Sequence, residues 1–136
     1  MSSKVVFGNA HVEGTSRWGW FIGHFIAPND LRSTPTLEVK WGVHQAGEGR
    51  SQWGTNTEAT TLSILIKGQF RLQFPDQEFL LSREGDYLLW APGVPHCWSA
   101  ESDCIIVTVR WPSKPGDSVG MPPQVEVSDT KSGSDI

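Results

Sequence analysis

The stretch GDYLLWAPGVPHCWSA, residues 85–100, joins a short apolar run to a turn that holds two prolines and a glycine. The prolines fix φ and Gly93 tolerates backbone conformations that other residues resist, so the turn delivers His96 with little freedom. Alternation along the following strand places His96 and Trp98 on one face. We therefore expect both side chains to point into the cavity that the fold encloses.

Outward from this turn, most of the chain alternates with the period of two that is typical of strands. The segment 17–26, RWGWFIGHFI, alternates in this way. No segment keeps a helical pattern over three turns, so we expect at most one helical turn, near residues 28–33. Short runs between turn residues at intervals near ten predict an all-β sandwich or barrel. The segment 37–44 has an apolar face opposite a polar one, composed respectively of Leu37, Val39, Trp41 and Val43, and of Glu38, Lys40, Gly42 and His44.

The segment 47–68, GEGRSQWGTNTEATTLSILIKG, is a second glycine-bounded pair of strands. In its last part, Thr61, Ser63 and Leu65 share one face, and three aliphatic residues share the other. Both faces look protected, as in the wall of a small barrel.

The sequence GDYLLWAPGVPH resembles the second conserved motif of the cupin superfamily, in which a Pro/Gly turn ends in a metal-ligand histidine. Ala91 and Ala100 depart from that motif, where a proline and an asparagine are usual, and residues 47–68 are similar to the first cupin motif. The resemblance spans about residues 37–111. It implies a single-domain, all-β cupin-type jelly roll, or double-stranded β-helix, over residues 1–111. The matching positions of the second motif are Gly85, Asp86, Gly93, Pro95 and His96.

The resemblance also places the metal ligands of the first motif. Counted back from Gly68, the two histidines and the glutamate fall at Thr55, Thr57 and Thr61, and a slip of one residue gives Gly54 and Asn56 for the histidines. Neutral hydroxyls are poor ligands for a divalent transition metal. We therefore predict a metal-free pocket and no cofactor. The alternative is a divalent transition metal at a rebuilt site of His44, Glu58 and His96.

The expected function is small-molecule binding, with His96 as the catalytic acid/base of an isomerase, epimerase or dehydratase, because an imidazole exchanges protons near neutrality. One alternative is a non-catalytic ligand-binding or sensing module. Another is a metal-dependent cupin enzyme with unusual ligands. The pocket is predicted to be lined by Thr55, Thr57, Thr61, Ser63, Trp53, Trp90 and Trp98.

The composition indicates which kinds of partner to expect. The formal net charge is −4 and no Lys/Arg cluster marks a phosphate track, so nucleic acid is not an expected partner. No run approaches the length of a membrane span or a secretory signal, which predicts a cytoplasmic protein. Cys97 and Cys104 are expected to be reduced core residues.

Small jelly rolls expose apolar outer faces, so we expect a homodimer in which the segment 17–26 covers the interface. Residues 112–136 are rich in Pro, Gly and Ser and lack aromatic residues, which predicts a tail. Within it, QVEV (124–127) is expected to dock on the domain or on a neighbouring subunit.

Overall fold

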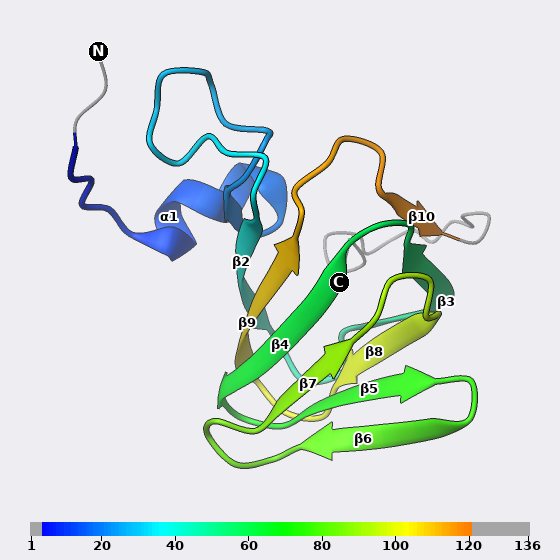
Figure 1. The fold of residues 1–136 in the computed structure, drawn as a ribbon. Helices are drawn as coiled ribbons and strands as arrows, with labels where there is room; N and C mark the ends of the chain where they lie inside the picture. The colour runs from blue at the N-terminus through cyan, green and yellow to red at the C-terminus, as the bar shows by residue number, and fades with distance from the viewer. Residues whose placement is uncertain (1–3, 121–136) are drawn as a thin grey trace.

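The computed structural model describes residues 4–120, and these form two facing antiparallel sheets of five strands each (Figure 1). The elements in chain order are α1 (Ala10–Gly14), the 3-10 helix η1 (Thr15–Arg17), β1 (Trp20–Ile22), β2 (Glu38–His44), β3 (Gly49–Asn56), β4 (Thr60–Lys67), β5 (Phe70–Phe74), β6 (Gln77–Leu81), β7 (Tyr87–Trp90), β8 (His96–Ala100), β9 (Cys104–Trp111) and β10 (Ser118–Gly120). The first sheet has the order β1-β2-β9-β4-β7 and the second β10-β3-β8-β5-β6. The predicted all-β fold is confirmed.

The helical turn lies elsewhere than expected, at α1 and η1 rather than at residues 28–33. Asn9 starts α1, because its side-chain oxygen accepts a hydrogen bond from the Val12 N–H at 3.0 Å. A helix of five residues is too short to show a helical period in the sequence, so pattern analysis misses it.

The strand expected over 17–26 shrinks to the three residues of β1. Trp18 and Gly19 precede it with positive φ angles of 54° and 103°, and Gly23 follows it at 152°. Such angles break the pleat, so the side chains of residues 17–26 do not share one strand face. Trp20 has the only buried apolar side chain there, at 5% exposure.

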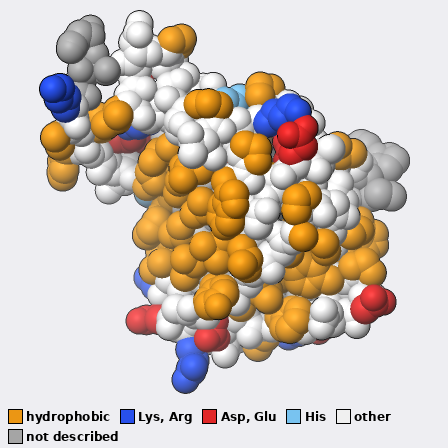
Figure 2. Space-filling view, viewed as in Figure 1, with side chains coloured by type: hydrophobic (Ala, Val, Ile, Leu, Met, Phe, Trp, Pro, Cys, Tyr) orange, Lys and Arg blue, Asp and Glu red, His pale blue; other side chains and the backbone are white. Residues whose placement is uncertain are grey.

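In β2 the polar face is the buried one. Glu38, Lys40 and His44 are buried, whereas Val43 on the opposite face is 47% exposed. The same inversion occurs in β4, where Thr61 and Ser63 are fully buried. Along β2 and at the start of β4, the first sheet therefore turns polar side chains inward, and the apolar side chains of its outer face form a broad orange surface in Figure 2.

The apolar core lies between the two sheets. Trp98 stacks on Phe70 with ring centroids 5.2 Å apart. The two cysteines are buried and not bonded to each other, as expected. The core cluster consists of Leu65, Phe70, Leu72, Leu81, Trp90, Trp98, Ala100, Cys104 and Ile106.

The folded domain continues beyond the boundary expected at residue 111. β10 pairs with β3, and the Asp117 carboxylate accepts hydrogen bonds from the N–H groups of Glu58 and Ala59 at 2.6 and 3.2 Å. Long-range pairing of this kind leaves no mark in composition. QVEV, at residues 124–127, lies outside the described residues. In the described part of the chain, no helix is long and apolar enough to cross a membrane.

Candidate ligand site at the barrel mouth

A pocket of about 410 Å³ opens at the polar end of the barrel, between the segment around β1, the start of β2, the end of β9 and residues 114–118. Trp20 lines it, with the Arg110 guanidinium 4.6 Å from the ring centroid. The Lys40 ammonium lies 5.7 Å from the same indole. The indole N–H of Trp20 is buried and has no hydrogen-bond partner among residues 4–120.

An ion pair crosses the mouth from β2 to β9. Arg110 Nη1 lies 3.3 Å from Glu38 Oε2 and donates to Ser118 Oγ at 2.9 Å. The Asn56 amide donates to the same Ser118 oxygen at 3.1 Å. Ser118 on β10 therefore links the mouth of the barrel to the inner face of β3.

A serine fixes the other oxygen of Glu38. Ser113 Oγ donates a hydrogen bond to Glu38 Oε1 at 2.7 Å. The same oxygen accepts a hydrogen bond from the backbone N–H of His24 at 2.9 Å. Because its only proton goes to Glu38, Ser113 Oγ also accepts from His24 Nδ1 at 2.7 Å, which places a proton on Nδ1. Sequence reasoning missed Glu38, Arg110 and Ser113; the polar face of 38–44 was the available signal.

The structure fits the alternative alignment of the first motif, in which the two histidine positions are Gly54 and Asn56. Gly54 lies opposite His96, and Asn56 is buried on the same face. Thr55 instead pairs with Val119 and is half-buried, and Thr57 is exposed. Thr55 and Thr57 therefore do not lie on the inner face of β3 with Gly54 and Asn56, as the prediction that they line the pocket required.

The other predicted pocket residues occupy different depths. Thr61 is fully buried opposite Trp90, and its hydroxyl oxygen has no hydrogen-bond partner in the described part of the chain. Ser63 bonds Thr108 across the strands at 3.0 Å. Trp98 belongs to the apolar core, and Trp53 is half-buried on β3.

His96 is 1% exposed and lies against aromatic rings. Its ring centroid is 4.9 Å from that of Trp90 and 6.4 Å from that of Phe74. Nδ1 lies 3.0 Å from the Val94 carbonyl oxygen, which can only accept, so Nδ1 carries a proton. In the neutral ring, Nε2 is then the basic nitrogen.

The residues present do not fit a divalent transition metal. Gly54, Asn56 and Thr61 offer no imidazole or carboxylate beside His96. The rebuilt set is not brought together: His44 Nδ1 contacts Glu48 at 3.2 Å, and Glu58 is an exposed partner of Lys114. Residues 4–120 hold no group of three His, Cys, Asp or Glu that could bind a metal ion.

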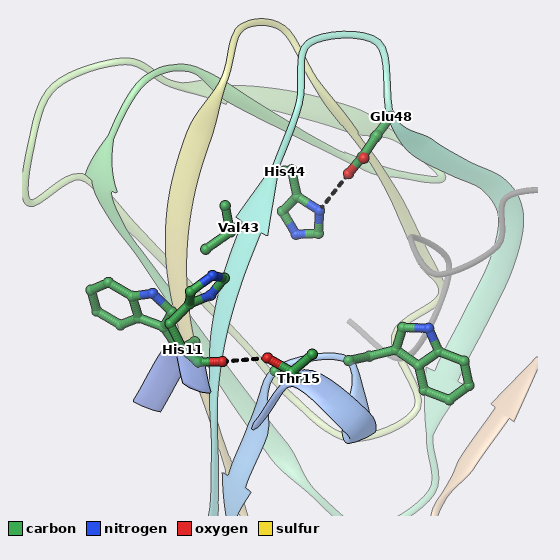
Figure 3. A pocket seen from close by; sticks show the side chains of 8 residues that line it. His11, Thr15, Val43, His44 and Glu48 are labelled. Atoms are coloured by element: carbon green, nitrogen blue, oxygen red, sulfur yellow. Dashed lines mark hydrogen bonds and ion pairs between the residues drawn. The ribbon is translucent and has the colours of Figure 1, made fainter. Parts of the chain in front are cut away.

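A smaller pocket of about 190 Å³ lies outside the barrel, against α1 and the end of β2 (Figure 3). His44 and Glu48 form one side of it, and His11 and Thr15 form the other. The His44 ring is buried against Trp98, with centroids 4.4 Å apart. His44 thus supports the core and borders this outer pocket, whereas it does not line the pocket at the mouth.

The strand arrangement matches solved structures. An uncharacterized conserved protein with a double-stranded β-helix domain from Klebsiella pneumoniae aligns with a TM-score of 0.57 and 17% identity, over 66% of this chain and 78% of its own. A cupin superfamily protein from Desulfitobacterium hafniense gives 0.53 and 17%, over 60% and 72%. KdgF from Halomonas sp. gives 0.52 and 19%, over 60% and 74%. No family model and no curated protein matches the sequence. These likenesses show the fold.

Proposed function

We propose that this chain, which has the cupin fold, is a small-molecule-binding protein whose ligand occupies the pocket at the barrel mouth. The observation that carries this proposal is the buried Trp20 indole N–H, which lines the pocket and has no hydrogen-bond partner among the described residues. A buried donor left without an acceptor costs about 1–3 kcal/mol. An oxygen of a bound ligand would supply that acceptor.

The chemistry of the mouth favours a ligand rich in acceptor oxygens. The carboxylates of Glu38 and Asp117 already accept hydrogen bonds from the protein. The Trp20 indole supplies a donor and a flat apolar face. A volume of about 410 Å³ falls within the range typical of small-molecule sites.

The first test is native mass spectrometry of untagged protein, which detects any retained ligand. That ligand and a collection of fragments are then titrated into the native protein and into the Trp20→Phe variant. This variant keeps an aromatic ring and removes the N–H. We expect an affinity at least fivefold below that of the native protein. Trp111→Phe is the control, because Trp111 is 39% exposed on the outer face. Equal affinities in both variants would contradict the proposal.

Proton transfer at His96 is the second candidate, as in an isomerase, epimerase or dehydratase. It is supported by the Val94 contact, which fixes the tautomer and makes Nε2 the base. The expected result is that His96→Ala abolishes turnover of an identified ligand but still binds it. A variant that turns over normally contradicts it, and then the non-catalytic binding module is the better description.

The metal-dependent alternative predicts a different measurement. Elemental analysis of untagged protein would find about one metal per chain if unusual ligands held an ion. Because Gly54, Asn56 and Thr61 offer no imidazole or carboxylate beside His96, we expect less than a tenth of one metal ion per chain.

We further propose that the chain forms a homodimer through the outer face of the first sheet, rather than through residues 17–26. Four strands of that sheet, three of them seven or eight residues long and β7 four residues long, lie about 4.8 Å apart and give a face on the order of 400 Å². A stable interface needs roughly 800 Å² per partner, so this face would form its core. Apart from Lys67, which pairs with Ile105 at one end, its strand residues are uncharged, which suits a second copy of itself. Its residues are Val39, Trp41, Val43, Leu62, Ile64, Ile66, Tyr87, Leu89, Ile105, Val107, Val109 and Trp111.

Light scattering coupled to size-exclusion chromatography tests the dimer. Leu89→Lys introduces a charge at a position 56% exposed on this face, and we expect it to elute as a monomer. Leu80→Lys, at a 39% exposed position on β6 of the other sheet, should remain dimeric. A native protein that is monomeric refutes the proposal.

A further inference from the structure

His24 lies in the wall of the mouth pocket, in the turn that follows β1. Its side chain is 29% exposed, and its Nδ1 atom contacts the Ser113 hydroxyl group. Nδ1 carries a proton, because Ser113 gives its own proton to Glu38. In the neutral ring, Nε2 is therefore the basic nitrogen. Residues 4–120 supply no hydrogen-bond partner to Nε2, so this nitrogen is left for a ligand in the pocket.

A carboxylate lies behind the imidazole ring. Glu38 Oε1 accepts from Ser113 Oγ at 2.7 Å and lies 3.6 Å from His24 Nδ1. The other oxygen of Glu38 pairs with Arg110 at 3.3 Å, so the negative charge acts on both Arg110 and His24. When Nε2 takes up a proton the ring becomes a cation, and the carboxylate stabilises it. Hydrolases orient a catalytic histidine through a hydrogen-bonded carboxylate in a similar way.

The same pocket supplies groups that stabilise a negative charge on a ligand. The buried Trp20 N–H has no partner among residues 4–120, and the rings of Trp20 and His24 both contact Phe25, at centroid distances of 6.4 and 5.3 Å. Arg17 also lines the pocket, and it donates to the backbone carbonyl oxygens of Trp20 and Glu13. Carbonyl oxygens leave the positive charge of Arg17 uncompensated. The pocket therefore combines a base with a donor and a cation.

We propose that His24 Nε2 is the general base of the mouth pocket and removes a proton from the carbon next to a carbonyl group. This rests on the proposed small-molecule function and names its ligand class, a small carbonyl compound. The proton passes to Nε2, the C–H electron pair forms a C=C bond, and the carbonyl π electrons move to the oxygen. The Trp20 N–H and the charge of Arg17 stabilise that enolate oxygen. Return of a proton to the carbon restores the carbonyl compound, so no oxidant, reductant or leaving group takes part.

His24 and His96 are thus rival bases, and their surroundings differ. His96 is 1% exposed, packs on Trp90, and is not among the residues that line the mouth pocket. Of the two, His24 is the one that borders a cavity of about 410 Å³. The two assignments therefore predict that different variants lose activity.

Deuterium exchange tests the base directly. Pyruvate, hydroxyacetone and dihydroxyacetone are incubated with native protein in D₂O, and proton NMR follows the signals of the C–H groups next to the carbonyl. We expect at least one probe to exchange at least tenfold faster than with free imidazole at the same concentration, since a positioned base contributes about 10²–10⁴-fold. If no probe exchanges faster, the inference is overturned. Probe binding that Trp20→Phe weakens would still leave the proposed function standing.

Variants then locate the base. His24→Gln should exchange the probes at the background rate and still bind them, because glutamine has no basic nitrogen. His11→Gln is the matched control and should keep the native rate, since His11 is exposed on α1 and lines the outer pocket instead. A His24→Gln protein that keeps the native rate overturns the inference. Loss of exchange in His96→Ala but not in His24→Gln would assign the base to His96.

Nitrogen-15 NMR of the native protein reads the tautomer without a ligand or a variant. At pH 8, His24 should show a protonated Nδ1 and an unprotonated Nε2, and the opposite tautomer overturns the inference. Ser113 is a positioning residue. Ser113→Ala should populate the other tautomer and lower kcat for exchange at least tenfold with little change in KM, whereas Ser113→Thr, which keeps the hydroxyl group, should retain the native values. A Ser113→Ala protein with the native tautomer and rate contradicts the role of the Ser113 hydroxyl group.

Discussion

Glu38→Gln is expected to destabilise the protein by about 3 kcal/mol, because it removes the charge of a buried ion pair and keeps the shape of the side chain. Arg110 Nη1 and Glu38 Oε2 lie 3.3 Å apart, and both residues are less than 10% exposed. Two unit charges at that distance attract by about 5 kcal/mol at an effective dielectric constant of about 20. Removing one partner of a buried pair typically costs about 3–5 kcal/mol. Ser118 and the Trp20 ring still stabilise Arg110, which favours the low end.

Urea unfolding at pH 7, followed by circular dichroism, measures this cost. Glu78→Gln is the control, because Glu78 also pairs with an arginine, at 2.7 Å, but its side chain is 49% exposed. An exposed pair of this kind contributes about 0–1 kcal/mol. Combining Glu38→Gln with Arg110→Met should recover much of the loss, since no buried charge is left without compensation. The reasoning is refuted if Glu38→Gln costs no more than Glu78→Gln.

Further predictions concern single buried groups. Thr61→Val should be neutral or stabilise the protein by up to about 1 kcal/mol in urea unfolding, because the Thr61 hydroxyl has no hydrogen-bond partner among the described residues; a loss above 1 kcal/mol would contradict this. Burial raises the pKa of Cys104 from 9.0 to about 11. The unfolded thiol therefore loses its proton first, and about 2–3 kcal/mol of stability present below pH 9 is lost as pH rises to 11. Cys104→Ala should show a shallower decline of stability over that range, and an unchanged slope would count against the burial argument. Cys97, whose pKa burial also raises, should react slowly with iodoacetamide in native protein at pH 8 and rapidly in urea.

The strands and the orientation of the second motif could be predicted because their determinants are local. Turn residues and a period of two locate β7 and β8 from a few neighbouring residues. The same alternation puts His96 and Trp98 on one face, and each is 1% exposed. A resemblance carried by these residues was enough to anticipate the cupin fold.

The side of the first sheet that faces inward could not be predicted in this way. Alternation separates Lys40 from Trp41 but does not say which of them is inside. The structure buries Lys40 at 1% exposure and leaves Trp41 half-buried. The pairing of β10 with β3 and the hydrogen bonds between His24 and Ser113 depend on distant segments. Neither leaves a periodic signal in the sequence.

The inverted faces of the first sheet link the two proposals made for this protein. Burying Lys40, Glu38 and Arg110 costs desolvation free energy that apolar residues at the same positions would avoid. A barrel that keeps such an interior loses stability unless another surface compensates or a ligand binds the charges. The outer face can compensate, because burying its apolar residues against a second copy contributes about 25 cal/mol per Å². If both proposals hold, the dimer should unfold at a lower temperature on dilution, and a bound small-molecule ligand should raise that temperature.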